Sequence, residues 1–334
     1  MTWLWVGVLL LAVWAAHWGA EHLANPLKKL RKQWGISVTA GGALIGLATA
    51  SPEVGINITS AIQGVSDIGL GAMIGANIIA LPLLVTVAYV ATRKRQLGGE
   101  HADHERHLRK HLLQVDPQAA TVQVLPYLGI LAIFALLTLP APWRGLQPID
   151  GWIMLAAYVG YFTQALLRGR QSSESADWSK REIGLALAGL AALAVGAYFT
   201  VFSTEKIVSA MGISKIVGGL FITAPVAALP EIFATWSVSR SGQVTSAVTS
   251  VIGDYAVTMT IAVLPLALTT LQIENFRLFW INLIFLALLP ALYGAFIYLG
   301  KPEPGLKRWQ VICLLVVYLF YIPIAVAFGV MSSS

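Results

Sequence analysis

The chain of 334 residues is 57% hydrophobic and only 11% charged, and its mean hydropathy is +0.73. Because soluble domains carry about 25% charged residues, this composition excludes an ordinary soluble domain and indicates a membrane protein. The single cysteine, Cys313, excludes a disulfide framework.

Apolar stretches of about 20 residues, the length that crosses the hydrocarbon core as a helix, recur along the whole chain. The first lacks the basic start and the cleavage site of a signal peptide, so we expect it to be retained. The sequence predicts an all-α polytopic membrane protein with about ten transmembrane helices, at residues 3–24, 37–62, 68–91, 121–140, 149–168, 183–203, 214–238, 244–270, 276–298 and 309–330.

The net charge of +6 is unevenly distributed between the predicted loops. If the N-terminus lies outside, all but four of the 22 Lys and Arg residues fall on the cytoplasmic side, the exceptions being Arg144, Lys206, Lys215 and Arg277. This is the positive-inside bias. The basic charge therefore sets orientation and does not indicate a nucleic-acid partner. It predicts an inner- or plasma-membrane protein with both termini outside.

Five landmarks occur twice in the same order: Gly-Ile-Ser, Gly-Gly, Pro-Glu and two single glycines. The first copy has them at Gly35-Ile36-Ser37, Gly41-Gly42, Pro52-Glu53, Gly64 and Gly75, and the second at Gly212-Ile213-Ser214, Gly218-Gly219, Pro230-Glu231, Gly242 and Gly253. Five predicted spans separate the copies, and five is odd, so the copies should cross the membrane in opposite directions. Inverted repeats of this kind are typical of secondary transporters.

We therefore expect two inverted five-helix halves joined by a hydrophilic linker. The first half is residues 1–168 with a repeat at about 35–91, the linker is 169–181, and the second half is 182–334 with a repeat at about 212–270. The longest loop, about 92–120, carries four histidines at helical spacing. We interpret this loop as a solvated cytoplasmic helix, and a regulatory metal or pH site is the alternative for His101, His104, His107 and His111.

Each Pro-Glu pair predicts a helix break followed by a carboxylate inside the membrane. Proline removes a backbone hydrogen bond, and the freed carbonyl needs a partner from protein or a water-filled cavity. A charge at mid-membrane costs roughly 2.5–3.5 kcal/mol on insertion scales, so Glu53 and Glu231 at matching positions predict a function. Carbonyl and carboxylate oxygens are the ligands of hard cations such as Ca²⁺ and Na⁺.

Further oxygen-bearing side chains lie near the two breaks. Asp254 follows Gly253 in the second copy, Asn77 follows Gly75 in the first, and Thr258 lies four residues after Asp254 on the same helix face. The hydroxyls of Thr49, Ser51, Thr223 and Ser250 are candidate ligands, although such hydroxyls more often form helix-packing contacts in membrane bundles. The predicted cation ligands are Glu53, Glu231, Asp254, Asn77, Thr49, Ser51, Ser250 and Thr258.

The segment from Gly19 to Ile78, with ATASPE and GANI, resembles the first α-repeat of the cation/Ca²⁺ exchanger superfamily, a family related to the Na⁺/Ca²⁺ exchangers. The segment GISKIVGGLFITAPVAALPEIFATW with the later SVIGDY resembles the second repeat. The resemblance covers nearly the whole chain. It implies ten helices in two inverted halves, antiport of Ca²⁺ against Na⁺, H⁺ or K⁺, and ligands from the second and third helices of each half.

By this resemblance, Glu53 and Glu231 match the family's essential glutamates and Thr49 matches its first-repeat threonine. The chain departs from the family where polar ligands are usual, at Ala50, Ala76, Ala80, Ala227 and Ala228, and Pro225 has no counterpart. Asp254 and Thr258 also differ from the usual serine and amide. The carboxylates still number three, enough to balance one Ca²⁺ or up to three Na⁺, and the loss of hydroxyls leaves room for H⁺ coupling.

We therefore expect a secondary antiporter that exchanges Ca²⁺ for Na⁺ at a midplane carboxylate site, with an H⁺-coupled divalent-cation antiporter as the alternative. Ions are its substrates, and no cofactor, enzymatic activity or partner beyond membrane lipid and inorganic cations is expected. Ser239-Arg240-Ser241-Gly242 resembles an element of membrane lipid-phosphate phosphatases, but the partner histidine segment is absent. A cation channel or sensor would use the same residue types. The sequence contains no G-x-x-x-x-G-K-[ST] phosphate-binding loop, so we do not expect transport to be coupled to ATP.

Overall fold

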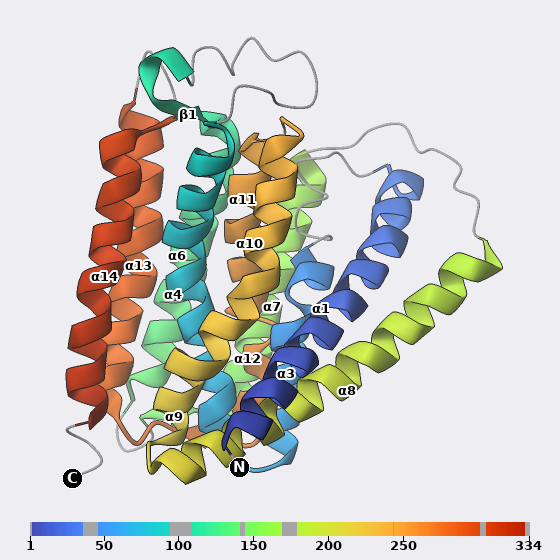
Figure 1. Cartoon of the computed structure of the whole chain (residues 1–334), viewed down its shortest axis with the longest axis vertical. Coiled ribbons are helices and arrows are strands. Elements are labelled where there is room, and N and C mark those ends of the chain that lie inside the picture. The colour runs from blue at the N-terminus through green and yellow to red at the C-terminus, as the bar shows by residue number, and fades with distance from the viewer. Residues whose placement is uncertain are drawn as a thin grey trace.

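The computed structural model describes residues 2–35, 46–93, 108–140, 144–168, 179–242, 244–300 and 305–330. Within these ranges the chain forms a bundle of long helices with two short β-ladders (Figure 1). Several predicted features lie outside them: Gly41 and Gly42, residues 169–178 of the linker, and His101, His104 and His107.

The described helices follow the predicted apolar stretches closely. Up to residue 168 they are α1 (Thr2–Gln33), α3 (Ser51–Ile62), α4 (Ser66–Ala91), α6 (Pro117–Thr138) and α7 (Pro148–Arg168). After residue 179 they are α8 (Lys180–Met211), α9 (Lys215–Gly218), the π-helical turn η1 (Gly219–Thr223), α10 (Ala224–Arg240), α11 (Val244–Thr258), α12 (Val263–Leu268), α13 (Phe276–Leu299) and α14 (Arg308–Val330).

Seven helical segments among the described residues are long and apolar enough to cross a membrane: Thr2–Leu30, Ser66–Ala91, Lys180–Met211, Lys215–Arg240, Ala247–Leu268, Phe276–Leu299 and Arg308–Gly329. The helical, multi-pass character is confirmed. The count of ten crossings and the inverted relation of the halves stay predictions. The beginning of α1 and the end of α14 lie at the same end of the bundle (Figure 1).

The predicted helix breaks differ between the two Pro-Glu pairs. Pro52 lies in the first turn of α3, after a turn at Ala50, where a missing N–H costs nothing. Pro230 lies inside α10, which continues through it. The prediction of a break at Pro230 is therefore wrong. The helices α9, η1 and α10 form one continuous rod, and its irregular part is the π-helical turn η1 at Gly219–Thr223, which ends seven residues before Pro230. Turns of this π-helical kind are frequent at functional sites.

Helix α4 lies at the centre of the bundle, and most of its side chains are buried. Glycines bring it against the rod formed by α9, η1 and α10: a Cβ on Gly71 would lie 2.4 Å from the carbonyl oxygen of Ile216, and one on Gly75 would lie 2.7 Å from Ala224 Cβ. Such contacts between small residues are how helices associate in lipid. They hold together the two segments that contain the repeats.

Helices α1 and α8 form a crossed pair at one side of the bundle (Figure 1). Their backbones approach closely because glycines occupy the crossing: a Cβ on Gly19 would lie 2.3 Å from the carbonyl oxygen of Gly189. Lys29 Nζ forms an ion pair with Glu182 Oε1 at 2.6 Å. The pair α1–α8 is therefore joined by packing and by charge.

Two antiparallel two-stranded ladders were not predicted from the sequence. β1 (Leu112–Gln114) pairs with β4 (Gly305–Lys307), and β2 (Gly145–Leu146) pairs with β3 (Leu271–Gln272). Strands of two or three residues are too short to produce a period-two pattern. Each ladder joins a connection from the first 168 residues to one from the later part of the chain.

Candidate cation site

Glu53 is the third residue of α3, and its side chain is 4% exposed. Its Oε2 atom is buried and has no hydrogen-bond partner. Burying an ionised carboxylate without a partner costs several kcal/mol, so this position needs a compensating cation or proton. The buried, unpartnered oxygen indicates a binding position.

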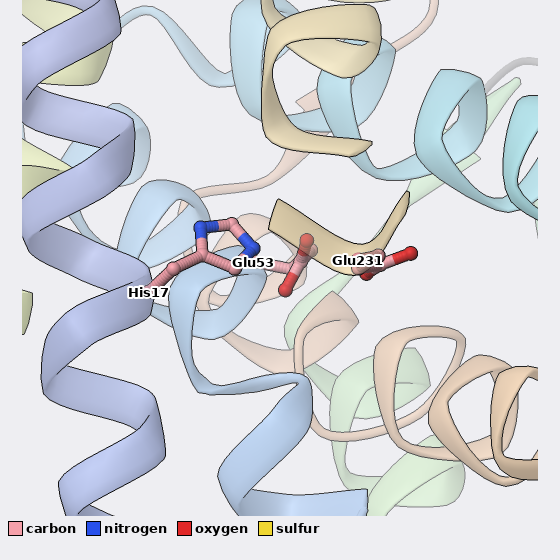
Figure 2. A group of neighbouring side chains, drawn as sticks. All are labelled: His17, Glu53 and Glu231. Carbon is pink, nitrogen blue, oxygen red and sulfur yellow. The ribbon is translucent and has the colours of Figure 1, made fainter. Parts of the chain in front are cut away.

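Glu231 comes from α10 and approaches Glu53 from the other part of the chain (Figure 2). One ligand atom from each of these carboxylates and one ring nitrogen of His17, on α1, lie within 4.8 Å of one another. Three elements that are far apart in sequence thus supply this His17–Glu53–Glu231 cluster. Glu53 and Glu231, both of them predicted cation ligands, therefore lie in one cluster.

Asp254, on α11, is the third acid near the cluster. Its Oδ1 accepts a 2.9 Å hydrogen bond from Thr49 Oγ1, and it lines the same cavity as His17 and Glu231. Among the described residues no lysine or arginine forms an ion pair with Glu53, Glu231 or Asp254. Three acids therefore lie near one another inside the bundle without a basic partner in the described part of the chain.

The cavity beside these acids has a volume of about 180 Å³. Besides His17, Glu231 and Asp254 it is lined by residues of α1, α4, α10 and α11 and by Thr49: Ala20, Glu21, Ala24, Leu84, Pro230, Ala234, Thr235, Ser250 and Val251. Most of them follow His17 on α1, follow Glu231 on α10 or precede Asp254 on α11. Since α1 and α10 run toward the end of the bundle that carries β1 (Figure 1), the cavity extends from the acids toward that end.

Asn77 and Thr258 do not join the acidic cluster. Asn77 Nδ2 donates to Thr258 Oγ1 at 2.9 Å, and Thr258 Oγ1 donates to Asn77 Oδ1 at 3.1 Å. Both side chains are buried between α4 and α11. Because each polar group of the pair satisfies the other, this arrangement stabilises a helix contact.

The remaining predicted hydroxyls bond mainly to nearby backbone. Ser51 Oγ donates to the Ala48 carbonyl at 2.7 Å, and Ser250 Oγ donates to the Ala247 carbonyl at 3.2 Å. Of these two, Ser250 lines the cavity. Thr223 forms a 2.7 Å hydrogen bond with Thr204 of α8, so its hydroxyl serves helix packing. Thr49 alone contacts an acid of the site.

His17 was missed in the sequence analysis. It has no motif and no counterpart in the second repeat, but it lies near the middle of a long apolar helix. An ionisable side chain at such a depth is by itself a signal of function. In the histidine-rich loop, the structure describes only His111, whose Nδ1 contacts the Arg93 guanidinium and which does not belong to the cluster.

A family model for the sodium/calcium exchanger protein matches residues 3–167 and 182–327 of the chain. Among solved structures, the sodium-calcium exchanger NCX_Mj soaked with 2.5 mM Na⁺ and 10 mM Sr²⁺ is similar, with a TM-score of 0.62 and 22% identity over 97% of this chain and 99% of that one. The same exchanger soaked with 10 mM Na⁺ and zero Ca²⁺ gives a TM-score of 0.61 at 22% identity and the same coverage.

At this identity the solved structures show a common fold. The comparison with curated proteins gave no match.

Proposed function

This chain belongs to the sodium/calcium exchanger family, and we propose that it is a secondary antiporter that exchanges a divalent cation for Na⁺ at Glu53, Glu231 and Asp254. Because the family is that of sodium/calcium exchangers, Ca²⁺ is the first divalent cation to test. Membership in a family of exchangers makes the chain a multi-pass membrane transporter of cations. The choice of ions, the site and the mechanism are our proposal.

The observation that carries the proposal is the meeting of Glu53 and Glu231 beside one cavity. These residues come from matching Pro-Glu pairs 178 positions apart in sequence, yet they contribute to one cluster. Oxygen-rich, negatively charged sites suit hard cations. Two copies of one motif at one site are what an inverted-repeat transporter uses at its midplane.

Obligatory exchange follows if the two ions compete for the same carboxylates. The empty site carries up to three buried negative charges. A change from access on one side of the membrane to access on the other is therefore electrostatically costly when no cation is bound. Loading with one divalent cation or with up to three Na⁺ lowers this cost. Coupling therefore needs no second site and no energy source other than the ion gradient.

The direction of the cavity beside the acids supports access to them from one end of the bundle in this conformation. The cavity extends toward the end that carries β1, and the loop of β1 is predicted to be cytoplasmic by the distribution of basic residues. We propose that this conformation is open inward. The crossed pair α1–α8, held to itself by glycine packing and by the Lys29–Glu182 ion pair, is the rigid unit whose displacement would open the other side.

Reconstituted protein tests the proposal and separates it from a channel. With Na⁺ inside the vesicles and none outside, ⁴⁵Ca²⁺ uptake should appear. It should vanish when Na⁺ is replaced by choline, which offers no exchangeable ion. Uptake that follows only an imposed pH gradient would change the coupling ion to H⁺, and uptake without any counter-ion would contradict exchange and indicate a channel.

The lipid-phosphate phosphatase alternative has no support at its own motif. Ser239 and Arg240 end α10, and Gly242 takes a positive φ of 88° in the turn after it. Ser241 Oγ donates to the Val238 carbonyl at 2.7 Å. The motif thus forms the end of a helix and its turn, which accounts for Ser241 and Gly242, whereas Ser239 Oγ and Arg240 Nη1 are buried without a hydrogen-bond partner.

A further inference from the structure

We infer that His17 is a ligand of the transported cation and that the cargo of this site is a first-row transition-metal cation, bound more tightly than Ca²⁺. The inference rests on the proposed function, since it names the cargo class of the same site. It is carried by the His17–Glu53–Glu231 cluster, in which one imidazole nitrogen and two carboxylate oxygens lie within 4.8 Å of one another.

The hydrogen bonding of His17 fixes which nitrogen faces the cluster. Nδ1 lies 3.0 Å from the carbonyl oxygen of Val13, one turn earlier on α1. A carbonyl can only accept, so Nδ1 carries the proton and the neutral ring has its lone pair on Nε2. Metal-binding histidines have this arrangement, because a carbonyl bonded to one nitrogen orients the other and makes it more basic.

The Nε2 atom of His17 is buried and has no hydrogen-bond partner. In Figure 2 the ring nitrogen farther from the α1 backbone, Nε2, faces the Glu53 carboxylate. The Oε2 atom of that carboxylate is also buried and has no hydrogen-bond partner. Two buried acceptors that face one another repel unless a proton or a metal cation lies between them. A metal ion bound by both atoms and by Glu231 removes both deficits at once.

The types of the donor atoms select the class of cation. Ca²⁺ prefers six to eight oxygen ligands, and an imidazole nitrogen adds little to its binding. Imidazole suits Zn²⁺, Fe²⁺, Ni²⁺ and Cu²⁺, and mixed imidazole–carboxylate sets are usual for such ions. Zn²⁺ bonds to both donor types at about 2.0–2.2 Å, so small rotations of the three side chains bring them onto one ion.

The small number of side-chain hydroxyls near the acids also favours a transition-metal cation over Ca²⁺. Ser51 and Ser250 bond to backbone carbonyls, and Asn77 bonds to Thr258. A hydroxyl that donates its proton keeps its oxygen lone pairs, but of these four residues only Ser250 lines the cavity beside the acids. An ion that needs six to eight oxygen ligands would therefore find few side-chain hydroxyls there. A four-coordinate ion needs only the three cluster residues and one more donor, for which water or Asp254 is available in the adjoining cavity.

The test uses purified full-length protein in detergent, with Zn²⁺ and Ca²⁺ titrated by calorimetry and Mn²⁺ examined by pulsed EPR. Wild type should bind Zn²⁺ more tightly than Ca²⁺. His17→Gln should weaken Zn²⁺ binding by at least about tenfold, the lower range for disturbing a metal site, and change Ca²⁺ binding by less than about twofold. Nitrogen coupling to bound Mn²⁺ should be present in wild type and absent in His17→Gln.

His22→Gln is the matched control, because His22 lies on the same helix and its Nδ1 is bonded to the Trp18 carbonyl at 2.8 Å, but it is outside the cluster. It should leave Zn²⁺ binding and nitrogen coupling unchanged. His17→Cys guards against misfolding: a thiolate is a zinc ligand, so this variant should retain Zn²⁺ binding that His17→Gln loses.

Three results would overturn the inference: Zn²⁺ bound no more tightly than Ca²⁺, equal losses for both ions in His17→Gln, or no nitrogen coupling in wild type. Each leaves the proposed function intact if Glu231→Gln abolishes Na⁺-driven Ca²⁺ uptake. If that uptake survives in Glu231→Gln, the proposed function itself fails, whatever His17 does.

Discussion

Thr49 Oγ1 donates a 2.9 Å hydrogen bond to Asp254 Oδ1, across 205 positions of sequence. Thr49 precedes α3, which carries Glu53, and Asp254 belongs to α11. The bond therefore orients one acid of the site from the opposite part of the chain. It leaves the second oxygen of Asp254 for the cavity that it lines.

Replacing Thr49 by valine keeps the shape of the side chain and removes this bond. A hydrogen bond to a charged group contributes about 1.5–3 kcal/mol, so we expect the KM for the transported cation to rise by roughly tenfold or more. Thr49→Ser, which keeps the hydroxyl, should stay close to wild type. An unchanged KM in Thr49→Val would show that this hydrogen bond does not support cation binding.

The buried pair Asn77–Thr258 gives a prediction about stability. Thr258→Val leaves the buried Asn77 amide without its partner, which costs about 1–3 kcal/mol, and the melting temperature in detergent should fall. Cation affinity in the protein that remains folded should hardly change. Lost affinity at an unchanged melting temperature would instead support the ligand role that the family resemblance implies.

Helix α4 lies so close to the rod at Gly219 that no side chain larger than that of glycine should fit at position 71 without a shift of the backbone. A Cβ there would meet the Ile216 carbonyl oxygen at 2.4 Å, and overpacking typically costs about 1–3 kcal/mol. Gly71→Ala should therefore lower the melting temperature. Gly129→Ala is the matched control, because a Cβ on Gly129 of α6 meets nothing within 4 Å and alanine favours a helix. Equal melting temperatures for the two variants would contradict this contact.

The sequence predicted the helices and the two glutamates because both signals are strong. Long apolar stretches need no tertiary information, and the repeated Pro-Glu pair links Glu53 to Glu231 before any fold is known. The partners of single polar groups are different. Nothing local distinguishes Asn77, which bonds to Thr258, from Thr49, which bonds to Asp254, since each choice depends on which helices meet.

His17 and Pro230 show two further limits. His17 becomes part of the site only because α1 lies across α3 and α10, a relation between elements that no spacing encodes. Pro230 predicts a break, but a proline removes only one helical hydrogen bond, and the surrounding helix continues. The distortion lies instead at Gly219–Thr223, beside the glycines that bring this rod against α4.

The central claim is that Glu53 and Glu231 together hold the exchanged cation, and Na⁺-driven ⁴⁵Ca²⁺ uptake into vesicles tests it most directly. Glu53→Gln and Glu231→Gln should each abolish uptake, because each removes a buried charge from the shared site. Glu205→Gln, which changes a glutamate of α8 outside the cluster, should retain it. Uptake at the wild-type rate in either Glu53→Gln or Glu231→Gln would contradict the account.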